Sequence, residues 1–215
     1  MSTPVQHLGD KPRHQPDQIA DDTFVIQDTQ GEGVAPATVH INSMVIRGRE
    51  PIVVDTGAPN NADRFIEDLF SLVEPDDVRW VFLSHDDIDH FGNLQALMDR
   101  CPRATLVTTW FAMERLACCG LDIRPDRTRW VADGESFDIG NRTMMAIRPP
   151  LYDSPTTRGL LDTRTGVYWA SDCFGTPVPS AATDVGDLDF DAWRDGFMHF
   201  QQWTSPWFAD LDRAR

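Results

Sequence analysis

A dense run of histidine and aspartate side chains over residues 84–90 (SHDDIDH) constrains this chain more than any other sequence feature. It directly follows an apolar, partly β-branched run (VRWVFL) that predicts a buried strand. His85 and Asp87 are two residues apart, so an extended backbone projects both side chains to the same side. Asp89 and His90 then lie where the chain turns into the next helix. These four groups of metal-ligand type at the end of one strand predict a metal site.

The simpler interpretation of this run is a solvated acidic turn with two incidental histidines. Its position between a predicted strand and a predicted helix, together with acidic residues at two later strand ends, argues against that interpretation. Asp86 points the other way from its neighbours in an extended backbone, so we expect a structural role for it.

The remaining pattern predicts one α/β (α+β) domain in which helices cover sheets of mixed direction. At 215 residues, the chain suits a single domain. The proline-containing segment 1–22 predicts disorder, which leaves a folded domain over 23–215. Apolar, alternating or β-branched runs predict strands over 39–46, 51–57, 78–83, 104–108, 128–131, 136–139, 142–148, 160–162 and 166–170. Helical spacing predicts helices over 63–73, 92–100, 110–118 and 188–203.

The charge balance narrows the classes of partner. Lys and Arg total 19 against 34 Asp and Glu, a formal net charge of -15. Such a field repels phosphate backbones, so we expect neither nucleic acid nor an anionic membrane surface as a partner. A cationic metal pocket reverses the field locally and admits an anionic small-molecule substrate. Since no apolar stretch approaches the roughly 20 residues of a membrane span, we expect a cytoplasmic protein.

Three motifs together resemble the metallo-β-lactamase superfamily. The stretch His85-x-Asp87-x-Asp89-His90 is similar to its His-x-His-x-Asp-His signature. Val53-Val54-Asp55-Thr56-Gly57 resembles the first motif, in which the Asp braces the metal loop. Tyr168-Trp169-Ala170-Ser171-Asp172 resembles the strand whose terminal Asp bridges two metals. The resemblance spans residues 41 to about 172 and implies an αββα sandwich, here without the last C-terminal strand and helix.

Two departures from the signature point to one branch of that superfamily. Asp87 stands where zinc hydrolases of this fold carry a second His, which resembles the His-x-Glu-x-Asp-His motif of the flavodiiron and oxygen-binding di-iron branch. Asp153 falls where the family has the His of His-Ser/Thr-Pro-Gly. Exchanging imidazoles for carboxylates makes a site harder and more anionic. The resemblance therefore implies two metal ions, with iron favoured over zinc or manganese.

The resemblance also implies a ligand arrangement. We expect His85, Asp87 and Asp153 to hold the first ion, Asp89 and His90 to hold the second, and Asp172 to bridge the pair. The relatives' second ion also takes a histidine from a C-terminal strand. His199 is the only downstream histidine here, and its place on an apolar helical pattern favours a packing role.

Three functions remain open from the sequence. The first is redox: an iron pair that binds dioxygen or a small oxide and receives electrons from a separate donor, because the chain has no room for a flavin module. The second is hydrolysis of an ester, lactone, thioester or phosphoester, with Asp89 as the catalytic residue that orients a metal-bound hydroxide. The third is a degenerate, non-catalytic member. The tryptophans near the C-terminus are compatible with a pocket cap or a homodimer face, but their helical spacing favours core packing.

Overall fold

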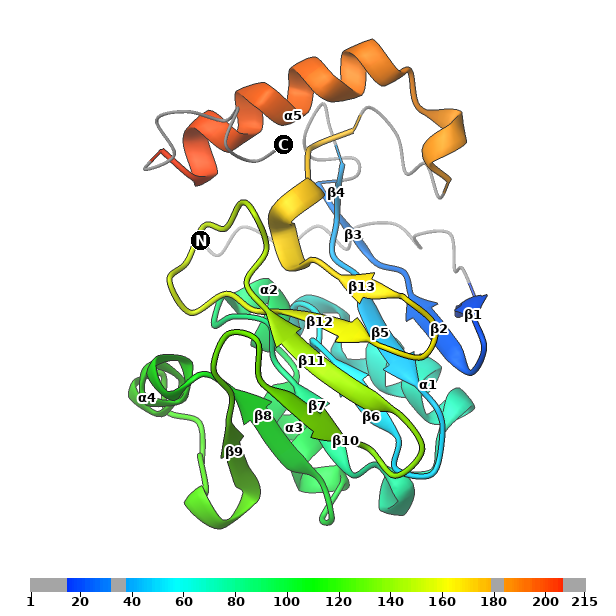
Figure 1. Cartoon of the computed structure of the whole chain (residues 1–215), viewed down its shortest axis with the longest axis vertical. Coiled ribbons are helices and arrows are strands. Elements are labelled where there is room, and N and C mark those ends of the chain that lie inside the picture. The colour runs from blue at the N-terminus through cyan, green and yellow to red at the C-terminus, as the bar shows by residue number, and fades with distance from the viewer. Residues whose placement is uncertain (1–14, 32–37, 179–183, 207–215) are drawn as a thin grey trace, which may run out of the picture.

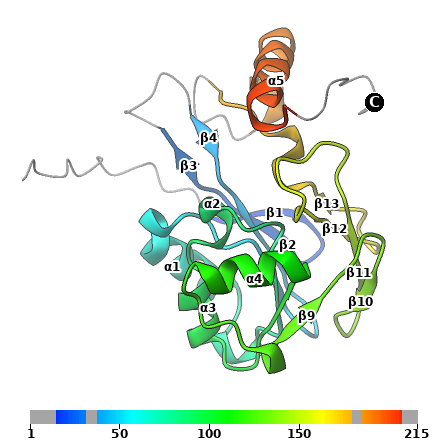
Figure 2. The same cartoon turned by 90° about the vertical axis from the view of Figure 1, so that its left-hand side faces the viewer.

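The computed structural model describes residues 15–31, 38–178 and 184–206. Two β-sheets lie face to face, and helices cover the outer face of the larger sheet (Figures 1 and 2). The predicted α/β architecture of mixed sheets and covering helices is therefore confirmed.

The larger sheet has seven strands in the order β1-β2-β5-β6-β7-β8-β9. Pairing is antiparallel from β1 to β6 and parallel from β6 to β9. The strands are β1 (Asp17–Ala20), β2 (Thr23–Ile26), β5 (Ser43–Ile46), β6 (Ile52–Val54), β7 (Trp80–Phe82), β8 (Thr105–Thr108) and β9 (Thr128–Trp130). Because β6, β7 and β8 run parallel, the segments that follow them leave the sheet at one edge.

The smaller sheet is an antiparallel meander. Its strands are β10 (Ser136–Asp138), β11 (Thr143–Ile147), β12 (Gly159–Asp162) and β13 (Tyr168–Trp169). A separate two-stranded ladder joins β3 (Thr29–Gln30) to β4 (Val39–His40). The end of β11, the start of β12 and the end of β13 lie side by side, so the 148–158 loop and the segment after β13 meet at one end of this sheet.

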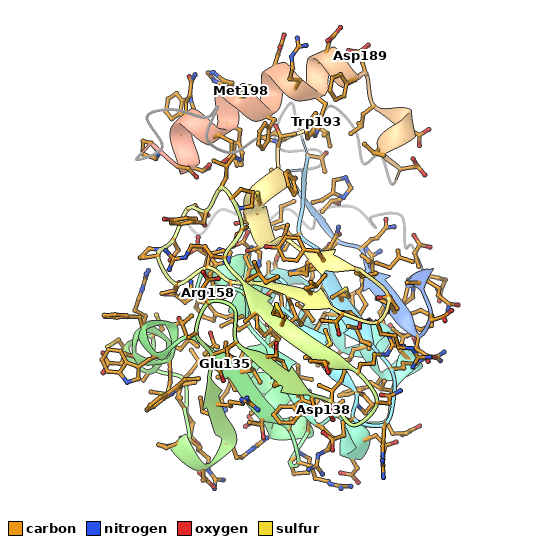
Figure 3. The ribbon with its side chains drawn as sticks, in the orientation of Figure 1. Glu135, Asp138, Arg158, Asp189, Trp193 and Met198 are labelled. Carbon is orange, nitrogen blue, oxygen red and sulfur yellow. The ribbon has the colours of Figure 1, made fainter. Side chains whose placement is uncertain are left out.

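The helices form close to the predicted ranges. They are α1 (Ala62–Leu72), α2 (Ile88–Phe91), α3 (Leu94–Arg100), α4 (Trp110–Cys118) and α5 (Phe190–Thr204). The Thr109 side chain caps α4 by accepting from the Ala112 N–H. Helix α5 carries Trp193 and Met198 and lies at the end of the sandwich beyond β13 (Figure 3). It is tethered to the 148–158 loop through Ser205, whose hydroxyl donates to the Tyr152 carbonyl.

Alternation along the strands produces two cores. In β5, β6, β7 and β8, one set of side chains packs against α1 and α3, and the alternate set packs against the smaller sheet. The helix-facing set includes Val45, Val53, Val81 and Leu106. The sheet-facing set includes Met44, Val54, Phe82 and Val107. Both faces of the larger sheet are thus buried, which explains why its central strands read as continuous apolar runs.

The two ends of the described chain differ in how well they match the sequence-based expectations. The prediction of disorder through residue 22 is wrong for 17–20, because these residues form β1 and pair with β2; residues 1–14 lie outside the described ranges. After β13, the described residues 171–178 and 184–206 contain helical segments and no further strand of either sheet. None of the helices within the described ranges is long and apolar enough to cross a membrane.

Candidate metal centre

The parallel strands bring two of the three motifs together. Asp55 directly follows β6, and Ser84 and His85 follow its parallel neighbour β7. Asp55 is fully buried and has a positive φ of 55°. The left-handed conformation turns the chain at the strand end, and Asp tolerates it better than most residues do. Ser84 donates to this carboxylate twice, from its N–H to Oδ1 and from its hydroxyl to Oδ2, both at 2.7 Å.

The smaller sheet supplies the third part of the site. Asp153 lies in the loop between β11 and β12, and Asp172 lies in the 3₁₀ turn η4 (Ser171–Phe174) that follows β13. Arg158, at the start of β12 (Figure 3), donates its backbone N–H to the Ser84 carbonyl at 2.8 Å. This hydrogen bond joins the two sheets directly beside the predicted ligands.

His85 is fully buried, and three carboxylates surround its Nε2 atom. The distances from Nε2 are 3.4 Å to Asp172 Oδ2, 3.6 Å to Asp87 Oδ2 and 3.9 Å to Asp153 Oδ1. Ligand atoms of His85, Asp87 and Asp153 all lie within 4.8 Å of one another. The structure therefore brings together the residues predicted for the first ion; their binding of a metal stays a prediction.

His90 presents its own Nε2 atom to the same space. That atom lies 3.0 Å from Asp172 Oδ1 and 3.8 Å from Asp89 Oδ2. The two imidazole rings are 4.1 Å apart between centroids. Ligand atoms of His85, His90 and Asp172 form a second group within 4.8 Å, which Asp89 does not join. Asp172 thus directs one oxygen to each imidazole, as a bridging ligand would.

The unsatisfied atoms of the cluster fit a bound cation. His85 Nε2 and Asp153 Oδ1 are buried without a hydrogen-bond partner in the described part of the chain. Buried polar atoms of this kind are costly unless something pairs with them. Both are good donors to a divalent metal, and they face each other across the site. The residues present therefore fit the metal pair that the resemblance implies.

Mutual charge shifts the pKa values of the cluster. Burial raises the pKa of Asp153 to about 6, and the nearby Asp172 and Asp87 carboxylates add to this rise against the opposing His85. The His85 ring beside it lowers the pKa of Asp87. Burial and its neighbour His90 oppose the charged form of His85, but the surrounding carboxylates still raise the pKa of His85. Of these carboxyl groups, Asp153 therefore holds its proton more tightly than usual until a cation displaces it.

His90 and Asp172 form the most strongly coupled pair of the cluster. Burial disfavours the charged form of His90, yet Asp172 and Asp55 raise its pKa well above the usual value. Burial likewise opposes ionisation of Asp172, but His90 and His85 lower its pKa below the ordinary carboxyl range. Without a metal, the buried imidazole and the partly exposed carboxylate therefore satisfy each other as an ion pair.

Asp55 has the bracing role that the first motif implied. Besides the two bonds from Ser84, its Oδ2 atom accepts from Trp169 Nε1 at 2.9 Å and lies 3.0 Å from His90 Nδ1. A carboxylate on Nδ1 leaves Nε2 of that ring as the atom available to a metal. Nothing in the sequence indicated the donors Ser84 and Trp169, because serine and tryptophan carry no metal-ligand signal.

Asp86 is structural, as expected. Its carboxylate accepts from the Thr156 hydroxyl at 2.7 Å and pairs with Arg115 Nε of α4 at 2.6 Å. These bonds fix the loop that carries Asp153. His199 of α5 belongs to neither ligand group. The expected packing role for it is wrong, since His199 is exposed and its ring lies 6.1 Å from that of Trp203.

Comparison with known proteins supports the resemblance. Residues 37–107 match the family described as the metallo-beta-lactamase superfamily. A Nostoc sp. protein named diflavin flavoprotein A 2 is 30% identical over 69% of this chain and 25% of its own length. An anaerobic nitric oxide reductase flavorubredoxin of Vibrio vulnificus is 26% identical over 62% of this chain and 27% of its own length. The chain thus spans about a quarter of such curated relatives.

Solved structures agree on the fold. The flavodiiron protein from Giardia intestinalis superposes with a TM-score of 0.77 at 19% identity, over 89% of this chain and 48% of that one. The rubredoxin oxygen:oxidoreductase of Desulfovibrio gigas gives a TM-score of 0.76 at 15% identity, over 87% and 48% of the two chains. This chain is therefore a metallo-β-lactamase domain protein, with homologues named diflavin flavoproteins and structural neighbours among the flavodiiron proteins.

Proposed function

We propose that this domain binds two iron ions at the His–Asp cluster and serves to bind or reduce dioxygen or a small nitrogen oxide. The observation that carries the proposal is the position of Asp172, whose two oxygens face two different buried imidazoles at 3.0 and 3.4 Å. Three further carboxylates line the same space. A donor set of two imidazoles and four carboxylates is hard and anionic, which suits iron better than zinc.

The ligands divide between the ions as follows. His85, Asp87 and Asp153 would hold the first ion, because their ligand atoms already form one compact group. His90 would hold the second with Asp89, and Asp172 would bridge. Asp89 lies 3.8 Å from His90 Nε2 and is about a third exposed, so only a small shift is needed to bring it to the metal. Iron ions held by these residues would, once reduced by an electron donor, provide the electrons for a small oxide.

The class of substrate comes from the relatives. Their names include a nitric oxide reductase and an oxygen:oxidoreductase. Since the chain spans only about a quarter of such curated relatives, the source of electrons for this domain is part of the proposal. We propose a separate donor protein or module. A homodimer face at the C-terminal tryptophans stays a prediction.

Hydrolysis is the second candidate, and the relatives do not favour it. A metal pair would lower the pKa of a bound water, and Asp89 would orient the resulting hydroxide. If the domain is a hydrolase, we expect it to bind zinc and to cleave a chromogenic ester. A degenerate domain would bind no metal at all.

A gas-consumption assay separates the three functions. The iron-loaded protein is reduced chemically without air, and dissolved dioxygen or nitric oxide is then followed with an electrode. The proposal predicts uptake by the wild-type protein and by His199→Ala, and loss of uptake in Asp172→Ala. Ester cleavage by the zinc-loaded protein without any gas uptake would instead favour hydrolysis. Failure to retain any metal would favour the degenerate domain.

A further inference from the structure

Two serine hydroxyls lie against the outer nitrogen of His85, on the side away from the carboxylates. The distance to His85 Nδ1 is 3.2 Å from Ser84 Oγ and 3.1 Å from Ser171 Oγ, and the two hydroxyls are 3.0 Å apart. Ser84 follows β7, whereas Ser171 begins η4 on the other side of the site. Ser171 is held there in a left-handed conformation with φ of 53°, which is unusual for serine. The three polar atoms thus form a closed triangle.

A count of protons decides the direction of each bond in this triangle. A serine hydroxyl has one proton to donate and two lone pairs that accept. Ser84 Oγ lies 2.7 Å from Asp55 Oδ2, an atom that only accepts when the carboxyl is ionised. The single proton of Ser84 is therefore used on Asp55. Towards Ser171 and His85, Ser84 can only accept.

The same count then fixes the other two bonds. Ser171 has one proton and two neighbours that can accept it, Ser84 Oγ at 3.0 Å and His85 Nδ1 at 3.1 Å. Donation to His85 would leave both contacts of Ser84 within the triangle without a proton. Donation to Ser84, with a proton on Nδ1, satisfies two of the three contacts, so this arrangement is favoured. The Ser171 proton is then used as well. His85 Nδ1 consequently faces two oxygens that can only accept, and it must carry a proton itself. The neutral imidazole is left with its lone pair on Nε2, which points into the carboxylate cluster.

We propose that Ser84 is a positioning residue that links Asp55 to His85 and holds His85 in the tautomer whose Nε2 atom is free for a metal, with Ser171 as a second hydroxyl beside the ring. Asp55 sets the tautomer of His90 directly, through the 3.0 Å contact to its Nδ1 atom. One buried carboxylate would thereby orient both imidazoles, His90 by direct contact and His85 through the Ser84 hydroxyl. The use of this tautomer for metal binding rests on the proposed function; the tautomer itself does not.

The order of these hydrogen bonds predicts opposite results for two similar alanine substitutions. In Ser171→Ala, the Ser84 hydroxyl still donates to Asp55 and still accepts from His85, so His85 Nδ1 keeps its proton. In Ser84→Ala, Ser171 loses its acceptor and is free to donate to His85 Nδ1. The proton of His85 then moves to Nε2, the atom needed by the metal. Each variant removes one hydroxyl beside the same ring, so a merely structural effect would not separate them.

The test is nitrogen NMR of the metal-free protein labelled with ¹⁵N-histidine, recorded over a pH series so that neutral imidazoles are compared. The expected spectra show the Nδ1–H form of His85 in the wild type and Ser171→Ala, and the Nε2–H form in Ser84→Ala. The affinity for Zn²⁺, used as a diamagnetic probe, should fall by about 10–100-fold in Ser84→Ala. It should change much less in Ser171→Ala, and Ser84→Thr, which keeps a hydroxyl, should restore it.

Three outcomes would overturn the proposal: an Nε2–H form in the wild type, an Nδ1–H form in Ser84→Ala, or the same switch in both alanine variants. The wild-type spectrum alone decides the matter if Ser84→Ala fails to fold. A correct tautomer pattern in a protein that takes up no iron would leave this proposal standing and reject the proposed function.

Discussion

Oδ1 of Asp172 lies 3.0 Å from Nε2 of His90. Asp172 follows a strand of the smaller sheet and His90 follows a strand of the larger sheet, so the packing of the two sheets brings them together. The other oxygen of Asp172 is turned to His85 at 3.4 Å. A carboxylate in this position can bind two ions at once, with one oxygen to each. The proposed metal centre depends on this arrangement of Asp172.

Replacement of the bridging carboxylate tests that arrangement. Asp172→Ala should reduce the metal content from about two ions per chain to about one or fewer, because both ions lose a shared ligand. His199→Ala is the matched control, since His199 is exposed and lies in neither ligand group. Metal per chain is measured by elemental analysis after gel filtration. Equal metal contents in the two variants would exclude Asp172 as a ligand.

The buried brace Asp55 offers a second test. Asp55→Asn keeps the shape of the side chain and tolerates the left-handed backbone, but it replaces one accepting oxygen by an amide donor. Donors from Ser84, His90 and Trp169 then compete for fewer acceptors. We expect a loss of about 3 kcal/mol in the free energy of unfolding and metal binding weaker by about 10–100-fold.

Urea unfolding and metal titration measure these two effects. Asp63→Asn at the exposed start of α1 is the control: it should leave the metal affinity unchanged and cost less than about 1 kcal/mol of stability, the size of a helix-dipole contribution. An Asp55→Asn protein with wild-type stability and wild-type metal affinity would show that Asp55 does not support the site.

The raised pKa of Asp153 predicts a pH dependence of the metal-free protein. This pKa is about 6 in the folded state against an ordinary value of 3.8, so the folded state holds the proton more tightly than the unfolded state does. The resulting stability is fully present below about pH 4 and is lost as the pH rises through about 6. Metal affinity should change in the opposite sense and rise over the same window, because the ion displaces that proton.

Asp153→Asn removes the titrating group and should flatten both pH profiles between about 4 and 6. Thermal melting and metal titration across that range give the measurement. A variant with unchanged pH slopes would assign the titration to another member of the cluster.

The ion pair between Arg142 and Asp162 holds the turn between β1 and β2 to the smaller sheet, and its removal tests this role. Both side chains are fully buried and meet at 2.7 Å, and Arg142 also donates to the Asp21 carbonyl. Arg142→Met leaves the Asp162 carboxylate buried without its cation, which should cost about 3–5 kcal/mol in the free energy of unfolding.

The control for that experiment is Arg124→Met. Arg124 pairs with Asp126 at 2.8 Å, but both side chains are more than half exposed. Its loss should cost less than about 1 kcal/mol, because water screens the pair. Similar losses in the two methionine variants would contradict a structural role for the buried pair.

The sequence predicted those parts of the fold that depend on local pattern. Alternation over 39–46 and the apolar run before His85 correspond to β5 and β7, and the stripe through Phe65 and Leu69 to α1. Strand β1 was missed, because its polar DQIA sequence leaves most of its residues exposed and is ordered by pairing with β2. Sequence pattern detects burial better than it detects edge strands.

The candidate site divides in the same way. His85 and Asp87 could be grouped because one strand end presents them, and Asp89 and His90 because they follow where the chain turns into the next helix. Asp153 and Asp172 were added through family resemblance. The hydroxyls of Ser84 and Ser171 could not be assigned to the site from the sequence, since their role depends on a contact across two sheets. Their function comes from three-dimensional proximity, which no local pattern records.

The central claim is that this cluster holds an iron pair. Its most direct test is elemental analysis of the protein purified from medium that supplies both iron and zinc, with Mössbauer spectra of the ⁵⁷Fe-grown protein. The account predicts about two iron ions per chain in a coupled pair. Zinc in place of iron, or a chain that retains no metal from the same medium, would contradict it.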